Sequence, residues 1–392
     1  MSLEKILKLK GMDPRYPIIQ GGMGIGISLY ELCSAVGRWG GVPTLSSVAL
    51  DQFTRKRLLA QGEEVIDVSP GRMDFIEATR REVEDTKKEA GVVAINIMCR
   101  LPLFYEMSVK GAVEGGANMI VSGAGLAINS GEDHTTDLPF LVEKYAGKNH
   151  NINLVPIVSS SAIANKICGN WTSRGYDTPD AIILEGPKAG GHLGWSYKRI
   201  ARSENFLKEF DLFDKLLDPV LVVAEKFGGI PVITAGGIYT HKNILYALSR
   251  GAAGVQMGSR FAATEESGFS NETKKLIIDA KKEDIVIADQ SWGSPCVFPF
   301  RYINNSPLAL EKSGEHFCIC TGLFGAAGQD NTNLLGTKGF PRKCPEGYVK
   351  EKGKICPAVG NTNYKTIGIL GSEGYRIDKV LSTQELMAEL IN

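Results

Sequence analysis

The sequence has no excess of charge of either sign, because its 44 lysines and arginines equal its 44 aspartates and glutamates in number. Without a basic excess, a chain lacks the electrostatic attraction that draws proteins to nucleic acids or anionic membranes. It also has no apolar run as long as a membrane span. Residues 1–6 have neither the apolar core nor the small-residue cleavage site of a signal peptide. We therefore expect a cytoplasmic protein that binds neither nucleic acid nor a membrane.

Histidine is scarce, with five residues, and none of them has the spacing of a zinc site that includes a carboxylate. The eight cysteines form two sets. Those scattered through apolar or mixed surroundings are expected to be buried thiols: Cys33, Cys99, Cys168 and Cys296. Those that crowd into one stretch rich in Gly, Pro and Lys are Cys318, Cys320, Cys344 and Cys356.

The clustered cysteines have two interpretations. In a cytosolic chain such a cluster indicates a metal site or free thiols rather than a disulfide framework. Four thiolates suit a zinc ion or an iron–sulfur cluster, so we predict such a site here. The spacing of Cys318 and Cys320 is tighter than the usual Cys-x2-Cys, however. A loop of reduced thiols therefore remains the alternative.

Glycine is abundant, at 45 residues, as many tight turns between strands and helices would require. The turns separate eight short apolar runs that are continuously hydrophobic rather than alternating, as is typical of strands buried on both faces. Segments with helical periodicity lie between them, for example 213–227 and 243–248. This pattern predicts an α/β fold, a (β/α)8 TIM barrel, with a doubly wound sheet as the alternative. The runs are 16–20, 41–46, 92–97, 119–122, 153–158, 181–185, 231–234 and 254–257.

The regular alternation stops after Phe261. We predict that residues 1–263 and 366–392 form the barrel with its terminal helix. Residues 264–365 would form an inserted cap with a helical piece at 271–282 and no regular strands, and this cap holds the clustered cysteines. The long charged connection from Asp51 to Ala90 predicts extra helices. The sequence Ser382-Thr383-Gln384-Glu385 is a capping box that starts the last helix, with Leu381 and Leu386 as a hydrophobic staple.

Two glycine-bearing stretches late in the chain indicate a phosphate site. Ala235–Ile238 and Val255–Phe261 each follow an apolar run, and a helical pattern separates them. Glycine allows a close approach of backbone to phosphate, and N–H groups at a helix start attract anions. In a barrel, loops after strands seven and eight commonly bind phosphate. A mononucleotide cofactor or a phosphorylated substrate would fit this pair.

Other residues at the ends of the predicted strands complete a candidate site. The stretch from Gln20 to Gly26 suits a glycine-rich floor beneath a flat ring better than it fits a dinucleotide fingerprint. Asn96 and Ser122–Gly125 offer hydrogen bonds at the barrel mouth. His192 stands in the glycine-rich loop that follows 181–185, and an imidazole in that position is suited to proton transfer.

Four stretches together resemble the nitronate monooxygenase family, formerly called 2-nitropropane dioxygenases: Pro17–Gly24, Glu185–Gly194, Ala235–Ile238 and Gln256–Phe261. The resemblance covers roughly residues 14 to 290 and resumes at 374–391. The related FMN-dependent enoyl-acyl-carrier-protein reductases share the fold and the motifs. The chain departs from many relatives at Lys188, where they carry glutamate, which implies a different preference for substrate charge.

The resemblance implies an FMN-dependent oxidoreductase with FMN at the barrel mouth and His192 as the catalytic base or orienting group. The expected activity is oxidation of alkyl nitronates by oxygen to a carbonyl product and nitrite, and a homodimer is expected. The alternative is an NAD(P)H-dependent enoyl thioester reductase that would dock an acyl carrier protein. A third hypothesis is a flavin-binding or ligand-sensing module without turnover. His192 makes this hypothesis less favourable, because a binding module has little need for a titratable group in its site. By resemblance, the cofactor-binding residues are Gly22, Met23, Asn96, Glu185, Gly190, Gly237, Gln256, Met257, Gly258 and Ser259.

Overall fold

The computed structural model describes residues 3–4, 6–69, 71–128, 136–288, 298–307 and 367–392. Its centre is an eight-stranded parallel sheet in the order β1-β11-β10-β8-β7-β6-β5-β2. A parallel bridge between Ile19 and Val42 joins the two ends of the sheet, and the Gln20 N–H donates to the Val42 carbonyl at 3.0 Å. The predicted (β/α)8 barrel is therefore confirmed, and the doubly wound alternative is wrong.

All eight predicted apolar runs form strands of this barrel. Alternate side chains of one strand face two different apolar layers: on β8, Ile183 belongs to the cluster inside the barrel, whereas Ile182 and Leu184 pack in the layer beneath the helices. Burial on both faces explains why the strands lack a polar alternation. The strands are β1 (Ile18–Gln20), β2 (Thr44–Ser46), β5 (Ala94–Met98), β6 (Met119–Gly123), β7 (Asn153–Val158), β8 (Ile182–Glu185), β10 (Val232–Ala235) and β11 (Gly254–Met257).

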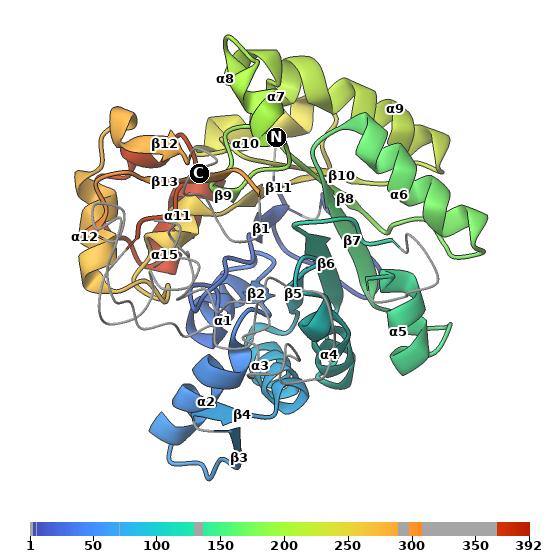
Figure 1. The fold of residues 1–392 in the computed structure, drawn as a ribbon, viewed down its shortest axis with the longest axis vertical. Helices are drawn as coiled ribbons and strands as arrows, with labels where there is room; N and C mark the ends of the chain where they lie inside the picture. Colours follow the sequence, from blue (N-terminus) through green and yellow to red (C-terminus); the bar gives the residue numbers. More distant parts are fainter. Residues whose placement is uncertain (1–2, 5, 70, 129–135, 289–297, 308–366) are drawn as a thin grey trace.

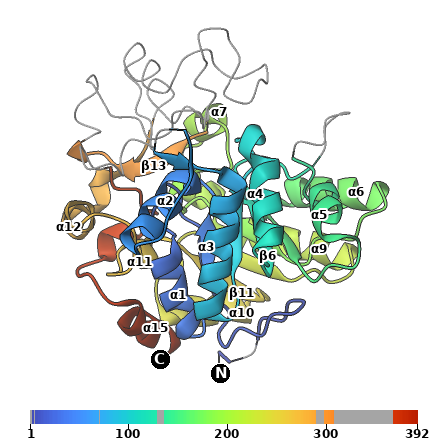
Figure 2. The ribbon, with the colours of Figure 1, turned by 90° about the horizontal axis from the view of Figure 1, so that it is seen from below.

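Helices surround the barrel, as Figures 1 and 2 show. The connection from Asp51 to Ala90 carries the expected extra helices, together with a hairpin of β3 (Asp67–Ser69) and β4 (Arg72–Met73) that projects from the body (Figure 1). Among the described residues, none of the helices has the length and apolar character needed to cross a membrane. The outer helices are α1 (Tyr30–Arg38), α2 (Leu50–Ala60), α3 (Phe75–Ala90), α4 (Pro102–Glu114), α5 (Leu138–Ala146), α6 (Ser161–Ser173), α7 (Tyr197–Ala201), α8 (Phe206–Glu209), a π-helical turn (Leu212–Leu217), α9 (Asp218–Lys226) and α10 (His241–Ser249).

The last helix, α15 (Thr383–Ile391), begins with the predicted capping box. The Ser382 hydroxyl accepts a hydrogen bond from the Glu385 N–H at 3.2 Å, and the Glu385 carboxylate accepts one from the Ser382 N–H at 2.9 Å. These bonds satisfy donors that a helix start otherwise leaves without partners. The apolar face of α15, which includes Leu386 and Leu390, is buried in the main core cluster. The C-terminus lies at the end of the molecule opposite β13 (Phe300–Ile303), as Figure 2 shows.

The segment after the barrel strands differs from the sequence-based expectation. Its helical piece is confirmed as α12 (Asn271–Asp279), but the expectation that it lacks regular strands is wrong. Strands β12 (Ile285–Ile287) and β13 (Phe300–Ile303) form a three-stranded sheet with β9 (Gly191–His192), which lies in the loop after β8. Short strands whose partners are distant in sequence leave little local pattern. The boundaries predicted at 263/264 and 365/366 stay predictions.

Candidate active site

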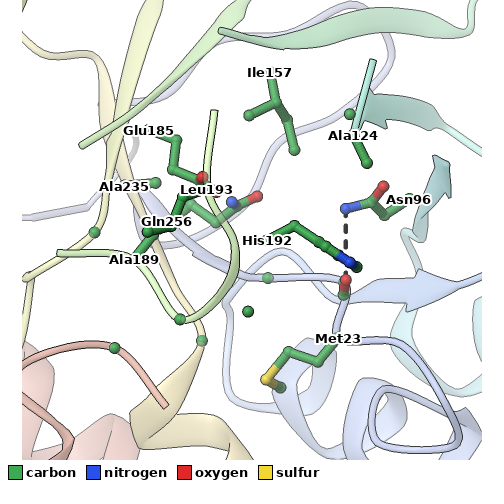
Figure 3. A pocket seen from close by; sticks show the side chains of 18 of the residues that line it. Met23, Asn96, Ala124, Ile157, Glu185, Ala189, His192, Leu193, Ala235 and Gln256 are labelled. Atoms are coloured by element: carbon green, nitrogen blue, oxygen red, sulfur yellow. Dashed lines mark hydrogen bonds between the residues drawn. The ribbon is translucent and has the colours of Figure 1, made fainter. Parts of the chain in front are cut away.

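A cavity of about 590 Å³ opens at the carboxyl ends of the barrel strands. This is within the range of small-molecule and cofactor pockets. It does not include Ser122, whose buried hydroxyl lies 2.7 Å from the Tyr105 hydroxyl. All of the residues that the sequence predicts for catalysis or cofactor binding line it, and Figure 3 labels several of them. These residues are Gly22, Met23, Asn96, Glu185, Gly190, His192, Gly237, Gln256, Met257, Gly258 and Ser259.

Backbone forms one side of the cavity, at the ends of β10 and β11. Gly237 has a φ of +88°, a conformation that non-glycine residues rarely adopt. A Cβ atom at Gly190 would lie 2.4 Å from the Leu370 carbonyl carbon, so chain from beyond the barrel packs directly on this loop. The Gly371 N–H donates to the Ser259 hydroxyl at 2.8 Å. We refer to the side formed by Gly190, in the loop after β8, and by the loops after β10 and β11 as the glycine side.

A buried network fixes the loop after β1 that forms the floor. Gln20 accepts a hydrogen bond from the Thr44 N–H at 3.0 Å and donates to the Ser28 hydroxyl at 2.7 Å. That hydroxyl in turn accepts from the Met23 N–H at 2.9 Å. Asn96 donates to the Gly22 carbonyl at 3.4 Å, the dashed contact in Figure 3. Sequence reasoning placed Asn96 and the glycines here but missed the support from Gln20 and Ser28.

The opposite side of the mouth is apolar. In the closed strand order, β5 and β6 lie across the barrel from β10 and β11. The ends of β5 and β7, with the loops and helix starts after β5, β6 and β7, supply aliphatic side chains to the cavity, and residues 298–300 supply aromatic ones. We refer to this set as the apolar side: Met98, Leu101, Leu126, Ile157, Ile163, Phe298 and Phe300. It suits the hydrocarbon part of a substrate.

His192 stands between the two sides, on β9, and its side chain is directed into the cavity (Figure 3). Its ring packs against the Phe300 ring at a centroid distance of 5.5 Å and the Phe298 ring at 6.1 Å. Burial lowers the pKa of the imidazole from 6.5 to about 4. The ring is therefore neutral at neutral pH, with one nitrogen that can donate a hydrogen bond and one that can accept.

Glu185 ends β8 and lines the cavity (Figure 3), and Ala235 of β10 lies between it and Gln256 of β11 in the strand register. Burial raises the pKa of its carboxyl to about 8, although the positive charge of Arg301 opposes the shift. Arg301 lies on β13 with 3% of its surface exposed, and its guanidinium donates to the Ala189 carbonyl. Sequence reasoning missed Arg301. The only local signal was a charge within the apolar run Phe300-Arg301-Tyr302-Ile303.

Gln256 has a buried side-chain oxygen with no hydrogen-bond partner among the described residues. The residue is 9% exposed and lies on β11 in the wall of the cavity. Buried polar atoms in folded proteins are rarely left unpaired. A polar ligand in the cavity would supply the missing donor.

Lys188, the residue at which the chain departs from many relatives, also lines the cavity. Its ammonium group is 3.2 Å from the Glu373 carboxylate, and its carbonyl accepts from the Ser372 N–H at 2.9 Å. The neighbouring carboxylate offsets the lysine charge. Sequence reasoning did not anticipate that residues 371–374 would reach the cavity.

No group of three or more His, Cys, Asp or Glu side chains in the described part of the chain is arranged to hold a metal ion. The predicted ligands Cys318, Cys320, Cys344 and Cys356 lie outside the described residues, as does Cys296. A zinc or iron–sulfur site there stays a prediction. The other three scattered cysteines are free and buried, as expected: Cys33, Cys99 and Cys168.

A model of the family described as nitronate monooxygenase matches residues 6–392, essentially the whole chain. The chain belongs to the nitronate monooxygenase family. Members of this family are enzymes and use FMN, so the protein is an oxidoreductase, and the resemblance drawn from the sequence motifs is confirmed.

Individual relatives agree with the family assignment. A probable nitronate monooxygenase of Staphylococcus saprophyticus is 25% identical over 294 residues, which cover 72% of this chain and 75% of the relative. One from Staphylococcus haemolyticus is 25% identical over 319 residues, 78% of this chain and 80% of the relative. Among solved structures, FabK from Thermotoga maritima has a TM-score of 0.59 at 21% identity and covers 98% of this chain and 93% of its own. Nitroalkane oxidase from Streptomyces ansochromogenes has a TM-score of 0.58 at 16% identity, with coverage of 98% and 95%. These two structures share the fold.

Proposed function

We propose that the protein is an FMN-dependent nitronate monooxygenase, which oxidises alkyl nitronates with oxygen to a carbonyl product and nitrite. The observation that carries the proposal is the neutral imidazole of His192 on the border between the glycine side and the apolar side. A nitronate has already lost its α-proton, so it needs no strong base. It needs a hydrogen-bond donor for its anionic oxygens, and a neutral imidazole supplies one.

The residues in the cavity fit FMN. Glycines and backbone amides at Gly237 and Gly258 suit a phosphate group. The Gly22–Met23 floor suits a flat ring, and the unpartnered oxygen of Gln256 can accept a hydrogen bond from a polar edge of the cofactor. We assign cofactor binding to these residues and to Asn96, Glu185, Gly190, Met257 and Ser259.

The cofactor, when bound, supplies the redox chemistry, and the protein supplies binding and orientation. His192 would hold an anionic nitronate oxygen of the substrate by a hydrogen bond. A pKa of about 4 makes this ring a weak base, since efficient general bases titrate near the working pH. The apolar side excludes water and receives the alkyl group, with Phe298 and Phe300 beside the His192 ring.

The alternative reductase activity draws on the same apolar side, which can also receive an acyl chain. An anaerobic titration of the purified holoprotein separates the two activities. Flavin absorbance is followed while propionate 3-nitronate, an alkyl nitronate or NAD(P)H is added to separate samples. We expect bleaching by the nitronates and none by NAD(P)H. Rapid bleaching by NAD(P)H with the nitronates inert would contradict the proposal, and enoyl thioesters would then be the substrates to test.

A further inference from the structure

Arg301 is a buried cation to which the proposed reaction gives no role. It lies on β13, outside the barrel strands, with 3% of its surface exposed. Its guanidinium donates a hydrogen bond to the Ala189 carbonyl, and burial lowers its pKa to about 10. Removing a charged group from water is costly unless nearby groups compensate. The groups that face Arg301 therefore indicate what it does.

Strand β13 holds the loop that carries His192. Phe300 pairs with His192 and Arg301 with Gly191 in an antiparallel register, and the Leu193 N–H donates to the Pro299 carbonyl at 2.8 Å. Successive side chains of a strand point to opposite faces. Phe300 accordingly contacts the His192 ring, while Arg301 extends on the other face to the turn at Ala189.

The same guanidinium acts on the start of the loop. Glu185 ends β8, and the charge of Arg301 lowers the pKa of its carboxyl against the effect of burial. Other charged side chains that line the cavity have partners of their own: Lys188 pairs with Glu373, and Arg260 pairs with Glu389. His192, which also lines the cavity, is neutral near pH 7. Arg301 is thus the cation that acts on Glu185 within the described residues.

We propose that Arg301 is a positioning residue, which holds the loop from Glu185 to His192 against β13 and places its positive charge within electrostatic reach of Glu185. The proposal rests on the proposed function only in giving His192 and Glu185 their roles toward substrate and cofactor. By this account, a strand from the segment after the barrel completes the active site, although Arg301 itself does not line the cavity.

Three substitutions test the proposal. Arg301→Met removes the charge and the hydrogen bond, whereas Arg301→Gln removes the charge but keeps a donor for the Ala189 carbonyl. Ile303→Ala is the control, because Ile303 is fully buried on the same strand and carries no charge. The first readout is the titration of the Glu185 carboxyl in the apoprotein, followed by infrared absorption of the protonated acid and assigned with Glu185→Gln.

We expect both Arg301 variants to raise the pKa of Glu185 by about one unit, because an opposite charge nearby is removed. Ile303→Ala is expected to leave the pKa of Glu185 unchanged even if the protein loses stability. If Arg301→Met does not fold, Arg301→Gln gives the same test. An unchanged pKa of Glu185 in both Arg301 variants, or an equal pKa shift in Ile303→Ala, would overturn the proposal. Because this titration uses neither flavin nor nitronate, its result is independent of whether nitronates are the substrates.

The second readout is steady-state kinetics of the holoenzyme. Loss of loop position is expected to lower kcat about 10-fold in Arg301→Met, with a smaller change in KM, because a misplaced catalytic group weakens interactions made in the transition state. Arg301→Lys keeps the charge and is expected to recover part of the loss. An unchanged kcat in Arg301→Met would contradict the positioning role.

Discussion

The two sides of the barrel mouth are built in different ways. On the glycine side, main chain lines the cavity, and its shape depends on residues without a Cβ atom, such as Gly190 and Gly237. On the apolar side, side chains such as Ile157 and Leu126 line the cavity. A backbone wall presents fixed N–H donors, whereas a wall of aliphatic side chains adapts to the shape of a hydrocarbon. The glycine side is therefore suited to a constant cofactor and the apolar side to a variable substrate.

The largest predicted effect comes from a substitution that disrupts the glycine side. Gly190→Ala would place a Cβ atom 2.4 Å from the Leu370 carbonyl carbon and 2.6 Å from the Gly371 nitrogen, so main chain has to move. We expect the free energy of unfolding to fall by about 3 kcal/mol and FMN affinity to fall by about 100-fold. Thermal unfolding and FMN fluorescence titration measure the two quantities.

Gly169→Ala is the matched control, because Gly169 lies within α6 and an added Cβ atom there has no neighbour within 4 Å. Alanine is favoured over glycine in a helix by about 1 kcal/mol, so this variant is expected to gain stability and to keep FMN. Equal FMN affinity in the two variants would contradict the role given to the glycine side.

A substitution on the apolar side is expected to weaken turnover of the substrate and to leave FMN affinity unchanged. Ile157→Asp puts a carboxylate in the wall that receives the alkyl group, where it repels an anionic nitronate. We expect kcat/KM for alkyl nitronates to fall about 10-fold or more, while FMN affinity stays at the wild-type value. Ile157→Val is the control for lost volume. Loss of FMN from the Ile157→Asp protein, with the fold intact, would contradict the assignment of the cofactor to the glycine side and the substrate to the apolar side.

The smallest predicted effect concerns the pH dependence of stability. Because the pKa of Glu185 is raised to about 8 in the folded protein, the native state binds more protons than the unfolded state above pH 4.5. This group therefore lowers the free energy of unfolding as pH rises toward 8. The shift of His192 acts between pH 4 and 6.5, where stability rises with pH, and adds nothing above that window.

Thermal unfolding of the apoprotein between pH 6.5 and 8 isolates the Glu185 contribution. We expect the wild-type melting temperature to fall more steeply with pH than that of Glu185→Gln, which does not titrate. Parallel pH profiles of the two proteins would mean that burial does not raise the pKa of Glu185.

The barrel and most of the candidate site could be predicted from local sequence signals. Continuous apolar runs such as 181–185 indicate buried parallel strands, and glycines after them indicate loops that approach a ligand. His192 was identifiable because it follows a predicted strand within a glycine-rich loop. In each case the signal and the structure that it predicts lie within a few residues of one another.

What could not be predicted depends on contacts between distant residues. Arg301 and Ala189 are separated by 112 residues, and the two-residue strand β9 exists only because β13 pairs with it. Lys188 likewise forms an ion pair with Glu373, a residue far from it in the sequence. Pairing over such distances has no periodicity that a local pattern could reveal.

The most direct test of the account is the anaerobic reduction of His192→Ala by an alkyl nitronate, followed by stopped-flow absorbance of the bound flavin. The glycine side is proposed to bind the cofactor and His192 to orient the substrate. We therefore expect full FMN occupancy with a rate constant for reduction about 100-fold below wild type. Reduction at the wild-type rate with FMN fully bound would contradict the role proposed for His192.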